Sequence, residues 1–205
     1  MPTGRQAEAA VNDSRVLAAA REVFATLGYE APVAAVAQAA GVGIASLYRR
    51  YGSKDELLAD VCLRSMVETS EVAQRALRLD ATAAVRLETY IRDCVAFRCG
   101  AFAGVAGMIP VSDAMIAAAR RSQRLTGRLL TAAQAAGEIR PDLTVVDVLR
   151  LIELFARAPR TPGETVDERL LAIALSGLRR ATQSDRPLPG PAPTLRQYRD
   201  RWSPT

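Results

Sequence analysis

The stretch Ala37–Leu58, AQAAGVGIASLYRRYGSKDELL, decides the fold of this chain. It reads as the end of one helix, a turn that contains glycine, a short second helix and the start of a third. Gly41 can take the left-handed backbone that ends a helix, and the small side chain of Ala37 lets two helices cross closely. This spacing predicts a helix-turn-helix, which would place the short helix over residues 44–51 in the major groove of DNA.

The side chains of this short helix are the candidate DNA contacts. Tyr48, Arg49 and Arg50 can hydrogen-bond to phosphates and to base edges. Residues 41–54 carry three basic residues and no acidic one, although residues 1–58 hold six of each. A short basic run is also common on ordinary solvated helix faces, so the argument depends on its position in the motif. The candidate DNA contacts are Val33, Gly43, Ile44, Ala45, Ser46, Tyr48, Arg49, Arg50 and Lys54.

Capping residues predict the helices on either side of the motif. Asn12–Ser14 offers N-caps for a first helix, which Gly28 would end. Pro32 suits the first turn of the second helix, where a backbone N–H has no intrahelical partner. Ser53–Glu56 is a capping box, in which the serine caps the start of a long helix. The sequence therefore predicts three packed helices followed by a fourth, long one that starts at residue 53.

Sixteen positions between Arg15 and Leu58 share a recognisable pattern. They are Ala20, Phe24, Gly28, Tyr29, Val36, Ala37, Ala40, Gly41, Val42, Leu47, Tyr48, Tyr51, Ser53, Lys54, Leu57 and Leu58. In these residues the chain resembles the tetracycline-repressor-like (TetR) family of transcriptional regulators. The resemblance implies that Tyr48 and Lys54 contact phosphates of operator DNA. Beyond Leu58 the resemblance is one of architecture only.

The rest of the chain reads as helix after helix, with no alternation of period two that would predict a strand. We therefore predict an all-α protein of about nine helices in two domains and a tail. The segments are a helix-turn-helix DNA-binding domain (1–52), a helical effector-binding and dimerisation domain (53–184) and a Pro-rich tail (185–205). In the tail, Leu195, Tyr198 and Trp202 fall on one face of a short helix, which either docks on the body or frays.

Soft and aromatic side chains cluster in the middle of the second domain, and they predict an apolar effector pocket. Flexible Met and thinly spread aromatic residues suit an uncharged, apolar molecule. Gly100, Gly104 and Gly107 weaken the helix that follows residue 99, so this segment is a candidate mover. The alternative is that these side chains only fill the core. The candidate pocket residues are Cys62, Met66, Tyr90, Cys94, Phe97, Phe102 and Met108.

Apolar residues cover much of the circumference of the last long helix, which we expect over about 165–181. One face can pack on its own domain, and the remainder favours a second chain. The alternative is a core within one chain. The family resemblance implies that the helix over 144–157 and this last helix build a four-helix homodimer interface. The candidate interface residues are Leu149, Ile152, Leu171, Ala174, Leu175 and Leu178.

Composition narrows the possible functions. The chain has 205 residues, a net charge of +5 and no histidine, so zinc-site and His-based acid/base chemistry are excluded. Its three cysteines lack metal-ligand spacing, and we expect no metal and no cofactor. The first residues are polar and of mixed charge, so we expect no signal peptide, and no apolar run reaches the ~20 residues of a membrane span. We expect a cytoplasmic protein that is not an enzyme.

These observations favour a DNA-binding transcriptional regulator. We expect a homodimeric repressor that a small apolar effector releases from double-stranded operator DNA. Two alternatives remain open at this point. One is a DNA-binding regulator that a protein partner controls, or that has no small ligand. The other is an enzyme with an attached DNA-binding domain, for which the sequence offers no histidine, phosphate loop or metal cluster.

Overall fold

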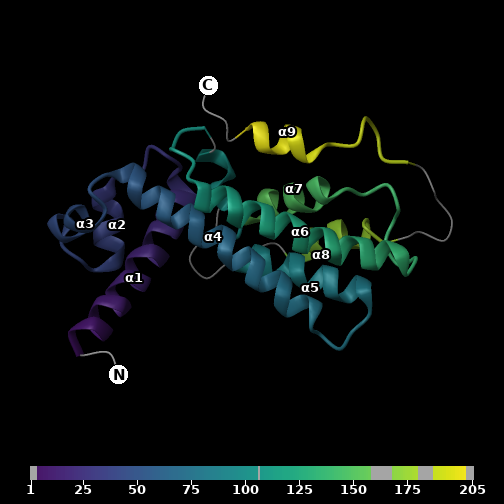
Figure 1. Ribbon diagram of the computed structural model, residues 1–205, viewed down its shortest axis with the longest axis horizontal. Helices are drawn as coiled ribbons and strands as arrows, with labels where there is room; N and C mark the ends of the chain where they lie inside the picture. The colour runs from purple at the N-terminus through teal and green to yellow at the C-terminus, as the bar shows by residue number, and fades with distance from the viewer. Residues whose placement is uncertain (1–3, 106, 158–167, 180–186, 202–205) are drawn as a thin grey trace.

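The computed structural model describes residues 4–105, 107–157, 168–179 and 187–201. Within these ranges the chain is all-α, as predicted, with the first three helices at one end of an elongated bundle (Figure 1). The helices are α1 Gly4–Leu27, α2 Val33–Ala40, α3 Ile44–Tyr51, α4 Lys54–Leu77, α5 Ala83–Ala96, α6 Asp113–Ala135, α7 Val145–Ala156, α8 Glu168–Ser176 and α9 Leu195–Asp200, with a 3-10 helix, η1, at Ala101–Val105. No helix in the described part of the chain is long and apolar enough to span a membrane.

The start of α1 differs from the prediction. The helix begins at Gly4, so Asn12–Ser14 lies inside it instead of capping it. Residues 6–10, Gln-Ala-Glu-Ala-Ala, are good helix formers and extend the helix past these polar residues. The carboxylate of Asp13 pairs instead with Arg50 of α3 at 2.8 Å. The side chain of Asp13, which was expected to help cap the helix, thus forms a tertiary ion pair instead.

Side-chain caps are present at the starts of α4, where Ser53 was predicted to cap the helix, and of α7. The hydroxyl of Ser53 accepts a hydrogen bond from the backbone N–H of Glu56 at 3.1 Å. Thr144 and Asp147 form a complete capping box at the start of α7. The start of the helix expected over about 165–181 falls outside the described residues. This helix ends at Ser176 and not near 181, and beyond its end the carbonyl of Leu178 accepts a hydrogen bond from the backbone N–H of Arg140.

Two apolar clusters form the interior, and α4 contributes to both. The first cluster joins α1, α2 and α3 with the first turns of α4, and it extends to Phe102, Val105, Ile109 and Met115. The second joins the last turns of α4 with α5, α6, α7 and α8. The long helix α4 therefore connects the helix-turn-helix to the bundle through continuous packing and not through a loop.

Candidate nucleic-acid interface and ligand cavity

The turn between α2 and α3 has the geometry of a helix-turn-helix. Gly41 has φ 67°, a left-handed conformation that favours glycine. The backbone N–H of Val42 closes the turn on the carbonyl of Ala37 at 3.0 Å. Leu47 and Tyr51 are buried against the first apolar cluster and hold α3 by one face. The opposite face of α3 therefore points away from the body of the protein.

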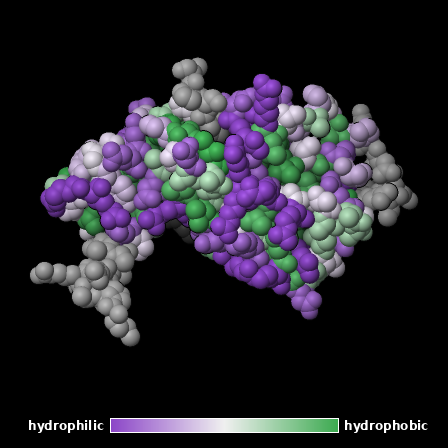
Figure 2. Space-filling view, viewed as in Figure 1, coloured by the Kyte–Doolittle hydropathy of each residue, from purple (hydrophilic) through white to green (hydrophobic). Residues whose placement is uncertain are grey.

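That outward face carries seven of the nine predicted DNA contacts. Residues 43–46 and 48–50 are exposed, and Ile44 and Tyr48 each leave 45% of their surface open. The end of the molecule formed by α2 and α3 is mostly hydrophilic, whereas apolar surface gathers on the helical body (Figure 2). Arg49 donates to the hydroxyl of Ser46 at 2.7 Å, which orients both side chains along α3.

Lys54 lies beside this face, at the first residue of α4. Its ammonium group stands 4.6 Å from the ring centroid of Tyr29, a cation–π distance. The hydroxyl of Tyr29 in turn donates to Asp55 at 2.9 Å, and this hydrogen bond raises the pKa of the tyrosine. These contacts hold the Lys54 side chain close to the helix-turn-helix.

Val33 is the predicted DNA contact that the structure does not expose. Its side chain is only 6% exposed and packs in the first apolar cluster. Val33 is the first residue of α2, where the backbone N–H has no partner within the helix. The side chain of Val33 is therefore not a DNA contact, and only its backbone N–H is placed to meet a phosphate.

A cavity of about 490 Å3 lies inside the second half of the molecule. Its lining comes from α4, the segment around η1, α6, α7 and α9, and most of the lining side chains are apolar. The lining residues are Cys62, Ser65, Met66, Thr69, Cys99, Gly100, Phe102, Ala103, Val111, Met115, Ile116, Ala119, Arg120, Ser122, Gln123, Leu149, Ile152, Glu153, Tyr198 and Arg199. Its size and apolar lining are typical of small-molecule sites.

The structure brings three of the seven predicted pocket residues together at this cavity: Cys62, Met66 and Phe102. Tyr90 and Cys94 do not line it, and both are buried in the second apolar cluster. The hydroxyl of Tyr90 shares a hydrogen bond of 2.7 Å with Thr126 there.

Phe97 and Met108 also lie outside the cavity, on the surface of the protein. Phe97 follows the end of α5, where its ring contacts the guanidinium group of Arg75 at 5.9 Å. Met108 lies in the turn that follows η1. The aromatic and sulfur-containing residues that suggested a pocket are thus divided between a core, a surface and a cavity.

Sequence reasoning missed the polar end of the cavity. Gln123 of α6, Glu153 of α7 and Tyr198 of α9 lie there, and they are far apart in the chain. No local sequence pattern marks them, because each is a single polar residue on an otherwise ordinary helix. Only the tertiary packing of α9 on α7 brings them together.

Two cysteines line the cavity and differ in acidity. Burial raises the pKa of the Cys62 thiol to about 12. A hydrogen bond from Cys94 lowers the pKa of the Cys99 thiol. Cys99 is therefore the more readily ionised thiol of the two.

The predicted dimer residues are mostly buried within one chain. Leu171 and Leu175 pack in the second apolar cluster, and Leu149 and Ile152 line the cavity. Ala174 and Leu178 are half-buried. The apolar side chains that α7 and α8 leave exposed are instead Leu154, at 68%, and Leu170 and Ile173, at 55% and 60%. Four of the six predicted residues thus face their own chain, because helical periodicity does not say which side of a helix meets its own core, and Ala174 and Leu178 stay predicted interface residues.

Polar contacts join α1 to the cavity region. Arg21 of α1 pairs with Glu68 of α4 at 2.5 Å and donates to the backbone carbonyl of Phe97 at 3.2 Å. Both partners are close in sequence to cavity residues, Thr69 and Cys99. These contacts join α1 to the two segments that border the cavity.

Comparisons with known proteins agree with this geometry. The family model described as bacterial regulatory proteins, tetR family, matches residues 16–61. The model described as the C-terminal domain of SbtR-like transcriptional regulators matches residues 82–180. A comparison with curated protein sequences gave no match.

Solved structures of TetR regulators are similar over most of the chain. One from Mycobacterium vanbaalenii is 28% identical, with a TM-score of 0.59, and covers 85% of this chain and 98% of its own. One from Streptomyces coelicolor is 26% identical, with a TM-score of 0.59, and covers 82% of this chain and 99% of its own. The ketosteroid regulator KstR2 of Mycobacterium tuberculosis, at 22% identity and a TM-score of 0.59, covers 82% of this chain and 95% of its own, and it shares the fold.

Proposed function

Because the chain belongs to the TetR family of transcriptional regulators, which bind DNA and are not enzymes, we propose that it is a homodimeric repressor released by a small apolar ligand. The observation that carries this proposal is the course of α4. This helix begins with Lys54 beside the recognition helix, and it supplies Cys62, Ser65, Met66 and Thr69 to the cavity wall.

The proposed DNA interface consists of the exposed face of α3 together with Lys54. The side chains of Ser46, Tyr48, Arg49 and Arg50 would contact phosphates and base edges. Two copies of α3 in a dimer would occupy successive major grooves, about 34 Å apart. Operator binding therefore depends on the distance that the dimer sets between its two recognition helices.

The proposed dimer forms through the exposed apolar face of α7 and α8. Leu154 of α7 and Ile173 of α8 each have more than half of their surface exposed. Exposed apolar side chains of this size are typical of a surface that another chain covers. The buried leucines of the same helices, Leu171 and Leu175, would support this face from within.

Ligand release would follow from a change in the cavity wall. A ligand between α4, α6 and α7 would shift α4, and the Arg21–Glu68 ion pair would carry the shift to α1. The two recognition helices would then no longer match two successive grooves. The coupling is reciprocal, so a true effector binds less tightly when operator DNA is present.

Selection of bound sequences from a random DNA pool, followed by a ligand screen for release of the selected DNA, tests this proposal. The matched variant is Met66→Trp, which adds volume inside the cavity and leaves α3 unchanged. We expect this variant to bind the selected DNA and to lose the response to ligand. A variant that responds to ligand as the natural protein does would refute the cavity as the effector site.

A further inference from the structure

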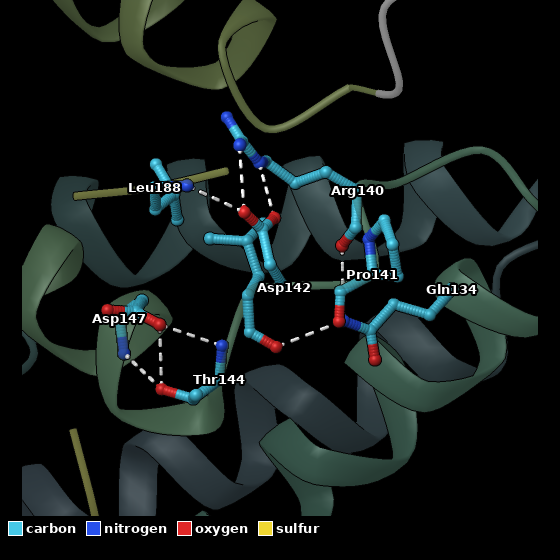
Figure 3. Close-up of polar contacts among 8 residues, drawn as sticks. Gln134, Arg140, Pro141, Asp142, Thr144, Asp147 and Leu188 are labelled. Atoms are coloured by element: carbon cyan, nitrogen blue, oxygen red, sulfur yellow. Dashed lines mark hydrogen bonds and ion pairs between the residues drawn. The ribbon is translucent and has the colours of Figure 1, made fainter. Parts of the chain in front are cut away.

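The segment 187–201, which we call the C-terminal strap, crosses the bundle and ends over the cavity. Its helix α9 lies alongside α7 (Figure 1). The N-terminal end of the strap is bound to the loop between α6 and α7, where the backbone N–H of Leu188 donates to Asp142 at 2.9 Å (Figure 3). Asp142 also accepts two hydrogen bonds from Arg140, and together these contacts lower its pKa to about 2.

The C-terminal end of the strap is held by a single buried carboxylate. Glu153 of α7 is 5% exposed, and the hydroxyl of Tyr198 donates to it. The guanidinium group of Arg201 donates to both of its oxygens, at 2.9 and 3.3 Å, and lies 4.3 Å from the ring centroid of Tyr198. Such a two-pronged contact between arginine and a carboxylate is among the strongest polar contacts in proteins.

The strap also forms part of the cavity wall. Tyr198 and Arg199 line the cavity, and Arg199 donates to Gln123 of α6 at 3.0 Å. Two helices of the bundle, α6 and α7, are thus bridged by α9 across the cavity. If the strap lifted, this side of the cavity would open to solvent.

Polar contacts and not apolar burial hold α9 in place. No residue of α9 is buried, whereas α6 and α7 each bury six or more residues. A segment with few buried apolar contacts opens at a lower free energy than the core around it. The strap can therefore open while the bundle remains folded.

Opening the strap would leave Glu153 in an unfavourable state. The carboxylate would lose Tyr198 and Arg201 but would stay beside an apolar cavity, with Arg150 of its own helix at 3.3 Å. A buried charge that loses its partner is costly unless another group pairs with it. Arg120 and Arg199 also line the cavity, but both are exposed, so water screens their charges more than that of Glu153.

We propose that the C-terminal strap is a lid latched on Glu153, which opens for a ligand that has an apolar body and a positively charged group. The charged group takes the place of Arg201 on Glu153, and the apolar body fills the cavity. This inference rests on the proposed effector function and adds the charge of the ligand and its route into the cavity. It replaces the uncharged ligand that the sequence predicts and the wholly apolar ligand named in the proposed function.

The lid is tested by the rate at which a neutral apolar dye, Nile red, enters the cavity of the full chain. Arg201→Ala removes the latch, and Arg196→Ala is the matched control, because Arg196 lies on the same helix and is 91% exposed. We expect the dye to associate about tenfold faster with Arg201→Ala, which corresponds to about 1.4 kcal/mol, and at the natural rate with Arg196→Ala. Tyr198→Phe keeps the ring and should show a smaller increase.

The outcomes of the dye experiment separate the lid from the proposed function. Equal rates for the natural protein and Arg201→Ala, with the signal lost in Met66→Trp, would overturn the lid and leave the effector cavity intact. Failure of every variant to bind the dye would overturn the cavity as a ligand site, and the lid with it. Circular dichroism of each variant shows whether it is folded.

The charge of the ligand is tested with three probes that share one chain length: octylguanidinium, octanol and octanoate. We expect octylguanidinium to compete with the dye at about tenfold lower concentration than the other two. Glu153→Gln keeps the shape of the side chain and removes its charge, so it should abolish this preference. A preference for octanoate, or an unchanged preference in Glu153→Gln, would overturn the assignment of a cationic ligand.

Discussion

Replacing Lys54 with alanine tests the placement of the DNA interface quantitatively. The structure places the Lys54 ammonium beside Tyr29, at the start of the helix that follows α3. Each lysine that neutralises a phosphate contributes about 0.9 to the slope of log K against log salt concentration. A dimer carries two copies of Lys54, so the slope should fall by about 1.8. Between 50 and 200 mM salt, the natural protein should therefore lose about tenfold more affinity than the variant.

The measurement is fluorescence anisotropy of a labelled operator at four or more salt concentrations. Lys54→Ala also removes the cation–π contact with Tyr29, which contributes about 0.5–1 kcal/mol to stability at an exposed site. Tyr29→Leu is the control for this contact, because it removes the ring and leaves the charge of Lys54 in place. Arg64→Ala is the control for net charge, since Arg64 is exposed further along α4. A slope that is the same for Lys54→Ala and the natural protein would refute the phosphate contact.

Three further results are expected. Ile173→Arg should convert the dimer to monomers in sedimentation at micromolar concentration, because it places a charge in the proposed apolar interface; an unchanged dimer would show that another surface is used. Arg21→Ala should keep operator affinity but reduce the effect of ligand on it several-fold in a titration, since the ion pair with Glu68 joins α1 to the cavity wall; an undiminished ligand effect would exclude this route. Iodoacetamide at pH 8 should alkylate Cys99 faster than Cys62 in peptide mapping, because a thiol reacts as its thiolate. The rate of alkylation of Cys62 should rise about tenfold per pH unit towards pH 12. A faster reaction at Cys62 than at Cys99 would contradict these acidities.

The helix-turn-helix could be predicted from the sequence because its determinants are local. Gly41 ends α2 through its own backbone conformation, and Ser53 caps α4 through a residue three positions away. The alternation of buried and exposed residues in α3 also follows from the spacing of Leu47 and Tyr51. Physical causes that act within one or two helical turns leave a readable pattern in the chain.

The cavity and the dimer face depend on long-range packing, which such patterns do not describe. Tyr90 and Cys94 share the apolar character of Cys62, and only the arrangement of the helices decides which of them borders a cavity. Leu171 and Ile173 are close neighbours in an apolar helix, yet one is buried and the other exposed. The contact between Glu153 and Arg201 joins residues 48 positions apart. The periodicity of the sequence does not predict polar pairs between residues so far apart.

The packing of α4 bears on how this regulator can be recombined with others. A cut at residue 52, where the sequence suggests a domain boundary, would pass between α3 and the side chains that complete its core, among them Leu57, Leu58 and Val61. The same core reaches forward in the chain to Phe102 and Met115. A chimera that joins this helix-turn-helix domain to the ligand-binding domain of another regulator would need to retain the packing of Phe102 and Met115 on the first apolar cluster. The candidate DNA contacts thus lie within one short segment, but the folding of that segment depends on residues much later in the chain.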